Sequence, residues 1–275
     1  MEQKKRNPDA QLITVILLAL LFIAVLLFAI LFSSKKGSDP KETKKETVSF
    51  PPITQGDDTV YDFTLSYSLA SAYDSYEYDE TELIFSSVSY PRLESGCGEH
   101  YESINSDIFA VASEYLTIKE HQKLLALEKY ERSESSAEGF ITNEFIFDCK
   151  SVSIKGRFLS VLFTLTKTVS ISEPSVENIT LLYDLVTGLR ADLSSLLGIG
   201  KADAISYVKT IISQDIAINH EMYYVNALDD LEYVIDLSDV YLTNEGAVIF
   251  FNAEILTPSV YGVRTFLIPY DKIGY

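Results

Sequence analysis

Few side chains in this sequence have the type and spacing that enzyme chemistry needs. The three histidines are His100, His121 and His220. They adjoin other ligand types only in "CGEH" (97–100) and "NHE" (219–221), and neither stretch has the i, i+4 spacing of a helical zinc site. The sequence also contains no nucleophile elbow, phosphate-binding loop or dinucleotide-binding glycine pattern. We therefore expect a non-enzyme without catalytic, cofactor-binding or metal-binding residues.

Two pairs of adjacent acids are the next candidates for chemistry. Asp57-Asp58 and Asp229-Asp230 are the residue type of glycosidase carboxylates and of calcium ligands. No EF-hand spacing surrounds either pair, and neighbouring acids in so acidic a chain are more typical of a solvated surface. An enzyme that acts on cell-wall glycan therefore stays only as an alternative hypothesis.

Cys97 and Cys149 are the only cysteines. Outside the cytoplasm, a disulfide that closes a loop of about 50 residues would stabilise the fold by roughly 3–5 kcal/mol. The alternative is a pair of unrelated buried thiols. The sequence supplies no Cα–Cα distance, so both interpretations stay open.

Residues 12–32, "LITVILLALLFIAVLLFAILF", predict a transmembrane helix. The 21 residues carry no charge, and at 1.5 Å per residue they span about 31 Å, which matches a bilayer core of roughly 30 Å. The run is longer than the apolar core of a signal peptide and has no cleavage pattern after it, which favours an uncleaved signal anchor. We expect residues 1–11 to form a cytoplasmic tail.

The orientation of this helix is argued from two opposing observations. Three Lys or Arg residues precede it and five lysines follow it, and by the positive-inside rule this count alone would place the C-terminal side in the cytoplasm. A long acidic domain with two cysteines favours the opposite orientation. We expect a single-pass protein of the cell membrane with its C-terminal domain extracytoplasmic.

Charge divides the chain sharply. The formal charge is −18 for the whole chain, and the +1 of residues 1–11 and the +2 of residues 33–47 leave −21 on residues 48–275. Such a region repels nucleic acid and anionic lipid. It attracts a basic partner, although the same charge also serves solubility alone.

After a flexible tether at residues 33–58, the pattern of residues 59–275 predicts an α+β domain. Strands and helices are mixed without regular alternation, which indicates a mostly antiparallel sheet with two or three helices. Two subdomains, 59–195 and 196–275, are an option. The expected strands are 59–68, 81–93 (ended by Pro91), 139–154, 157–172, 246–255 and 263–270. Residues 178–198 are expected to form a strand, a turn at Thr187-Gly188 and a short strand or helix. The expected helices are 101–116, 117–134 and 201–218, and 70–80 is expected as a surface loop, with an adhesive strip as the alternative.

Three phrases of the sequence stand out together. The first phrase is "SYPRLESG" followed by Ile104-Asn105, and the second is "LLYDLVTGLRADLSSLL". The third comprises Leu242–Gly246, Phe250–Asn252, Pro258, Gly262 and Ile268–Tyr270. In this order they resemble an extracytoplasmic module that occurs in RsiV-like, lysozyme-sensing anti-sigma factors of Gram-positive bacteria and in front of some peptidoglycan deacetylase domains.

The resemblance implies a binding or sensing module whose partner is lysozyme, another wall hydrolase or a wall component. The ligand-binding residues that the resemblance implies are Asn252, Glu254, Pro258, Tyr261 and Gly262. Glu254 stands one place earlier than in the family, which would turn it to the other face of a strand. Eleven residues before the membrane cannot hold a sigma factor, and none are left for a deacetylase domain. An envelope scaffold and a purely structural hairpin, with Val248, Phe250, Phe266 and Ile268 as core, are the alternatives.

Overall fold

The computed structural model describes residues 45–48, 53–55, 59–61, 63–133, 140–169 and 174–273. The predicted cytoplasmic tail and transmembrane helix, and most of the tether, lie outside these residues. Within the described ranges, no helix combines the length and the apolar character that crossing a bilayer requires.

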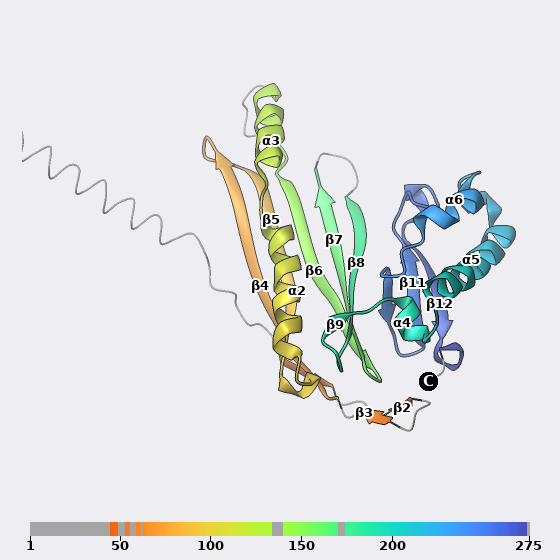
Figure 1. The fold of residues 1–275 in the computed structure, drawn as a ribbon. Coiled ribbons are helices and arrows are strands. Elements are labelled where there is room, and N and C mark those ends of the chain that lie inside the picture. Colours follow the sequence, from red (N-terminus) through yellow and green to blue (C-terminus); the bar gives the residue numbers. More distant parts are fainter. Residues whose placement is uncertain are drawn as a thin grey trace, which may run out of the picture. The chain divides into compact units, whose positions relative to one another are not determined.

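A seven-stranded sheet is the largest sheet of the described residues (Figure 1). The strand order is β1-β4-β5-β6-β7-β8-β9, and all neighbours are antiparallel except β5 and β6, which are parallel. The strands are β1 (Lys45–Val48), β4 (Leu65–Tyr78), β5 (Thr81–Leu93), β6 (Asn143–Lys155), β7 (Phe158–Thr168), β8 (Ser175–Asp184) and β9 (Leu189–Arg190). Two short strands, β2 (Ile53–Gln55) and β3 (Thr59–Tyr61), pair with each other.

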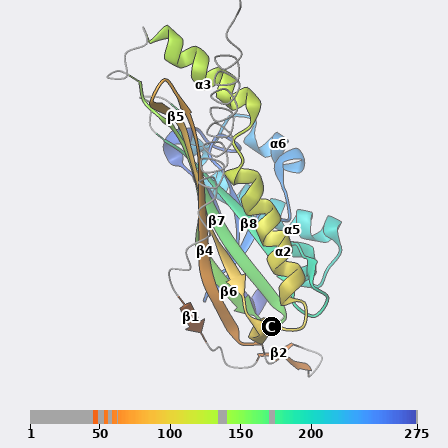
Figure 2. The same cartoon turned by 90° about the vertical axis from the view of Figure 1, so that its left-hand side faces the viewer.

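Helices cover one face of this sheet. Helix α2 (Tyr101–Leu116) places Ile104, Ile108 and Ala112 on one side at helical spacing, and these side chains are buried against the sheet. Helix α3 (Glu120–Arg132) continues along the sheet after a short break (Figure 2) and packs on β5, where Ala126 and Tyr130 join a smaller core.

The opposite face of the sheet supports a second core. Leu159 and Tyr183 belong to the first core, whereas their neighbours Phe158 and Leu182 belong to the second, because successive side chains of a strand point to opposite faces. The second core is completed by α4 (Leu193–Leu197), α5 (Lys201–Ile218), α6 (Ala227–Val234) and the three-stranded sheet β10 (Val240–Leu242), β11 (Gly246–Phe251) and β12 (Arg264–Pro269). Residues 40–275 form one unit.

The predicted fold class, α+β with a mostly antiparallel sheet, is confirmed for the described residues. The helices expected at 101–116 and 201–218 have those bounds in the structure, and the second predicted helix begins at Glu120. Helix α6 and strand β10 were not anticipated. The final two strands form a sheet of their own with β10, and Val248, Phe250, Phe266 and Ile268 are buried as expected.

The surface loop expected at 70–80 is wrong, because β4 continues to Tyr78 and the turn to β5 occupies only Asp79 and Glu80. The prediction that the strand ends at Pro91 is also wrong, because β5 continues to Leu93. The pairing of β5 with β6 stops at Ser89, and residues 91 and 93 direct their backbone to that vacated side. A proline there removes no hydrogen bond of the sheet.

Candidate binding surface

The first phrase of the resemblance has a structural role. The Asn105 side chain accepts a hydrogen bond from Leu93 N (2.7 Å) and donates one to Leu93 O (2.9 Å), so that it stands in for a neighbouring strand at the end of β5. A Cβ at Gly96 would lie 2.9 Å from Thr64 O, and Thr64 N donates to Gly96 O. The phrase therefore fastens β4, β5 and α2 together.

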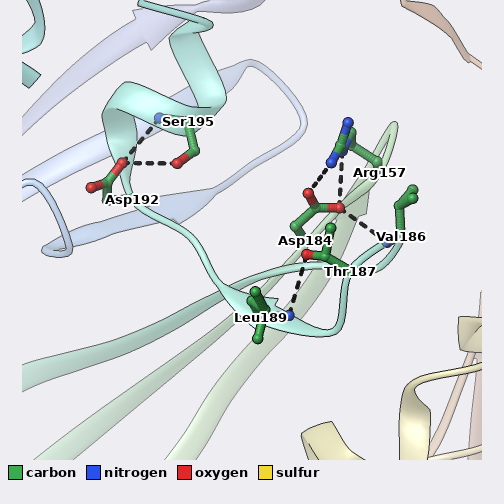
Figure 3. A network of polar contacts seen from close by, with 7 residues as sticks. All are labelled: Arg157, Asp184, Val186, Thr187, Leu189, Asp192 and Ser195. Carbon is green, nitrogen blue, oxygen red and sulfur yellow. Dashed lines mark hydrogen bonds and ion pairs between the residues drawn. The ribbon is translucent and has the colours of Figure 1, made fainter. Parts of the chain in front are cut away.

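The second phrase builds the corner from β8 to α4 (Figure 3). Asp184 accepts hydrogen bonds from Arg157 Nε (2.9 Å) and Val186 N (3.0 Å). Asp192 caps α4 by accepting from Ser195 N (3.0 Å). Burial would raise the pKa of Asp192, but the bonds from Ser194, Ser195 and Lys201 lower it to about 2. These acids are engaged within the fold, which gives them a structural role.

The third phrase begins with the turn between β10 and β11. Thr243 Oγ1 accepts hydrogen bonds from the backbone N–H groups of Glu245 and Gly246, both at 3.2 Å. The Tyr270 hydroxyl donates to Thr243 O at 2.7 Å, which ties the end of the chain to this turn. Burial raises the pKa of Tyr270 to about 12, so the hydroxyl stays a donor at neutral pH.

Asn252 follows β11 and bonds to the outer edge of β8. Its side-chain oxygen accepts from Asn178 N (2.7 Å), and its side-chain nitrogen donates to Asn178 O (2.9 Å). Strand β8 pairs with β9 only at Tyr183 and Asp184, so the amide occupies an edge position that would otherwise be open. The structure thus gives this predicted ligand-binding residue a role in joining the two sheets.

The loop from Asn252 to Val263, which we call the closing loop, carries the other predicted site residues. Glu254 is exposed, has a φ of 69° and lies in a turn, so the expectation that a shift of one place would flip it across a strand does not apply. Pro258 starts a 3-10 turn at Ser259–Tyr261. Gly262 has φ 64° and ψ −154°, a conformation that is essentially restricted to glycine, and it leads the chain into β12.

A partly buried polar cluster supports the closing loop. Arg264 Nη2 contacts Asp215 Oδ2 (2.7 Å) and the Tyr223 hydroxyl (3.2 Å), and Asn219 donates to Asp215 Oδ1 (2.9 Å). The Tyr223 hydroxyl also donates to Asp215. Burial would raise the pKa of Asp215, but these donors hold it below its usual value. The cluster connects α5, the segment after it and β12.

Large apolar side chains are exposed on the closing loop and on the neighbouring segment at Tyr224–Leu228. The two segments are joined by a hydrogen bond from Tyr224 N to Leu256 O at 3.0 Å. Val225 is fully exposed and Val260 is 81% exposed. We define the closing-loop patch as Tyr224, Val225, Leu228, Ile255, Val260 and Tyr261.

The charged residues around this patch in the sequence are acids. Residues 219–263 contain eight Asp or Glu and neither Lys nor Arg. Exposed apolar side chains within an acidic surrounding are complementary to an apolar protein surface with a basic rim. Only Tyr261 of the patch was among the predicted site residues. The combination of Tyr224-Val225 with the absence of Lys and Arg from residues 219–263 was the signal that could have identified the rest.

Asp239 is the acid whose ionisation the fold opposes most clearly. Burial, and then the charge of Asp236, raise its pKa from 3.8 to about 6. A raised carboxyl pKa means that the folded state binds more protons than the unfolded state between about pH 4 and 6, so stability falls as pH rises through that range.

We therefore expect Asp239→Asn to raise the free energy of unfolding at pH 7 by about 1–2 kcal/mol, after allowance for partial exposure. Urea denaturation of both proteins at pH 4 and pH 7 measures this, and the gain should be small at pH 4. A matched Asp229→Asn change on exposed α6 should have no such pH-dependent effect, and an equal gain at both pH values would contradict the prediction.

Of the residues first considered for chemistry, Asp57 and Asp58 lie outside the described residues. Among the described residues, no three His, Cys, Asp or Glu side chains gather as metal ligands. The possible disulfide between Cys97 and Cys149 is not formed. The buried Cys97 thiol faces the carbonyl oxygens of Thr64 and Ser66 beside β4, whereas Cys149 lies on β6.

No family model and no curated protein matches the sequence. Solved structures do resemble the fold. A DUF3298 family protein from Bacteroides fragilis has a TM-score of 0.50 and 16% identity, over 76% of this chain and 92% of that one. A DUF3298 family protein from Pseudomonas aeruginosa has a TM-score of 0.48 and 11% identity, over 77% of this chain and 94% of that one. At the observed identities the likeness is one of fold: residues of this chain fold like a DUF3298 domain.

Proposed function

We propose that this chain is a membrane-anchored, extracytoplasmic binding module that holds a basic protein partner, a cell-wall hydrolase of the lysozyme type, on its closing-loop patch. One observation carries the proposal. Exposed apolar side chains lie on two hydrogen-bonded segments within residues 219–263, which contain eight Asp or Glu and neither Lys nor Arg. The resemblance to RsiV-like modules supports the choice of partner. The apolar run at 12–32 supports the anchor.

The patch has the properties of a protein-binding site. Its loops begin and end on fixed points, namely the Asn252 amide at one end and the Arg264 cluster at the other. A pre-positioned loop pays less conformational entropy on binding than a free one. Apolar anchors supply the affinity, and the acidic surroundings accelerate encounter with a basic protein and make it sensitive to salt.

The test is a pull-down of lysozyme by the detergent-solubilised full chain at increasing salt concentration. We expect binding at low salt that declines as salt screens the attraction. The double variant Val225→Ser/Val260→Ser should weaken binding by at least about tenfold, or 1.4 kcal/mol, because it removes apolar contacts without changing charge.

The matched control is Leu124→Ser, an equally conservative change of an exposed side chain on α3. It should bind lysozyme like the wild-type chain. Failure of the wild-type chain to retain lysozyme at low salt would refute the hydrolase partner. Equal binding by the double variant and the wild-type chain would refute the role of the patch.

A further inference from the structure

The two helices on this face of the sheet are separated by a short break. Helix α2 ends at Leu116, and α3 then packs mainly on β5, with Lys129 reaching Asn143 of β6 and Val169 after β7. Figure 2 shows the two helices following one another along the sheet, with the break at residues 117–119 between them. A cleft of about 330 Å³ opens beside this break. Its volume is at the lower end of the roughly 300–1,000 Å³ of small-molecule sites.

The floor of the cleft is apolar and firmly held. It is formed by Phe145, Leu165 and Ile118, of which Leu165 and Ile118 are buried. The Tyr115 ring on the helix wall stacks on Phe147 with ring centroids 4.4 Å apart, and Ser86 Oγ donates to Tyr115 O at 3.0 Å. Such a floor accepts a small aliphatic side chain.

The walls carry charges of both signs. On the helix side, Lys119 Nζ lies 3.7 Å from Glu114 Oε1, and on the strand side Lys167 Nζ lies 2.6 Å from Glu177 Oε1. All four residues line the cleft. Burial and then the charges of Glu114 and Glu177 raise the pKa of Tyr115, consistent with both carboxylates lying near its hydroxyl. The cleft thus carries two ammonium groups and two carboxylates, so its formal charges balance.

The two ammonium groups and two carboxylates of the cleft limit the kinds of ligand that it can bind. Two carboxylates disfavour a phosphate or a fatty acid, and two ammonium groups disfavour a simple cation. A ligand with an amine, a carboxylate and an apolar centre satisfies all the groups present. Exposed ion pairs contribute only about 0–1 kcal/mol. The two ion pairs can therefore separate at small cost, so that the lysines bind the carboxylate of the ligand and the glutamates bind its ammonium group.

We propose that this cleft binds a short peptide of two or three residues through its free amino and carboxyl ends. Glu114 and Glu177 receive the ammonium end, Lys119 and Lys167 receive the carboxylate, and an aliphatic side chain lies on Phe145 and Leu165. The site is separate from the closing-loop patch, so it does not depend on the protein partner proposed above.

The experiment is isothermal titration of the full chain in detergent with alanyl-leucine, and with the same dipeptide blocked by N-acetylation, by C-amidation, or at both ends. We expect a dissociation constant near the millimolar range, and at least tenfold weaker binding for each blocked form. Lys167→Met should weaken the free dipeptide at least fivefold. Lys150→Met, which removes a similar exposed pair with Asp148 outside the cleft, should not.

Two results would overturn the proposal. The first is that the free dipeptide gives no heat of binding at a concentration ten times the expected dissociation constant. The other is indifference, in which the blocked dipeptides or the Lys167→Met chain bind as well as the free dipeptide and the wild-type chain. A lysozyme pull-down with saturating dipeptide separates the two proposals, because lysozyme retention is expected to be unchanged.

Discussion

Replacing Gly246 with alanine is expected to lower the free energy of unfolding by about 3 kcal/mol. Gly246 opens β11, opposite Pro269 of β12. A Cβ there would lie 2.2 Å from Ile268 O and 2.9 Å from Ile268 C. These are backbone atoms of the neighbouring strand, which cannot turn aside as a long side chain can, so the two strands must separate.

Urea denaturation of the full chain in detergent measures this loss. Gly200→Ala is the matched control, because Gly200 has a φ of −65° and an added Cβ would meet the Asp203 Oδ2 atom at an ordinary contact distance of 3.5 Å. That control should change stability by less than about 0.5 kcal/mol. If both variants unfold at the wild-type midpoint, β11 and β12 do not approach each other at Gly246 as described.

The second large effect is expected from Arg264→Met. Methionine preserves most of the side-chain volume but removes the cation that contacts Asp215 and Tyr223. The side chains of Arg264 and Asp215 are 20% and 27% exposed, so the carboxylate is left partly desolvated without its partner. We expect a loss of about 2–3 kcal/mol, below the full cost of breaking a buried pair because water still reaches the site.

The double variant Arg264→Met/Asp215→Asn separates charge from packing. Removing both charges should recover part of the loss, because the uncompensated carboxylate is gone. The pH response gives an independent measurement. The depressed pKa of Asp215 stabilises the wild-type chain above the unfolded pKa, and this contribution is lost as pH falls through the folded pKa. A single variant with unchanged stability and acid sensitivity would show that the cluster does not support the fold.

The regular elements could be predicted because their side-chain period is undisturbed. In 101–116 the apolar residues Ile104 and Ile108 recur at four-residue spacing, and the helix has the predicted bounds. The same holds for 201–218, where Ala204, Val208 and Ile212 are the buried residues. For these segments, local periodicity and tertiary packing favour the same structure.

Prediction failed where pairing partners decide the structure. Residues 70–78 carry tyrosines among acids and small polar residues, a pattern that does not show that they pair along their whole length with β5, where a register shift leaves Leu83 as the extra residue. Pro91 stays inside β5 because no strand needs its missing N–H, which depends on where β6 ends. Likewise, nothing in the sequence around Asn252 indicates that its amide would be used by Asn178, 74 residues away.

The sequence directed attention to the closing loop but not to the apolar residues beside it. The third phrase directed attention to the closing loop, and Pro258, Tyr261 and Gly262 do lie there. The apolar partners Tyr224 and Val225 come from a segment whose short helical turns have no readable period. Their proximity to the loop follows from a backbone hydrogen bond between distant segments, which composition and spacing do not specify.

The Asn252 amide is also a position at which deamidation would alter the fold. It closes the outer edge of β8 by one donated and one accepted hydrogen bond. Deamidation to aspartate keeps the size of the side chain and its acceptor but removes the donor to Asn178 O. A strand edge with unsatisfied backbone groups is a template for pairing with another molecule. We therefore expect deamidation of Asn252 to expose the edge of β8 and to promote self-association of the domain.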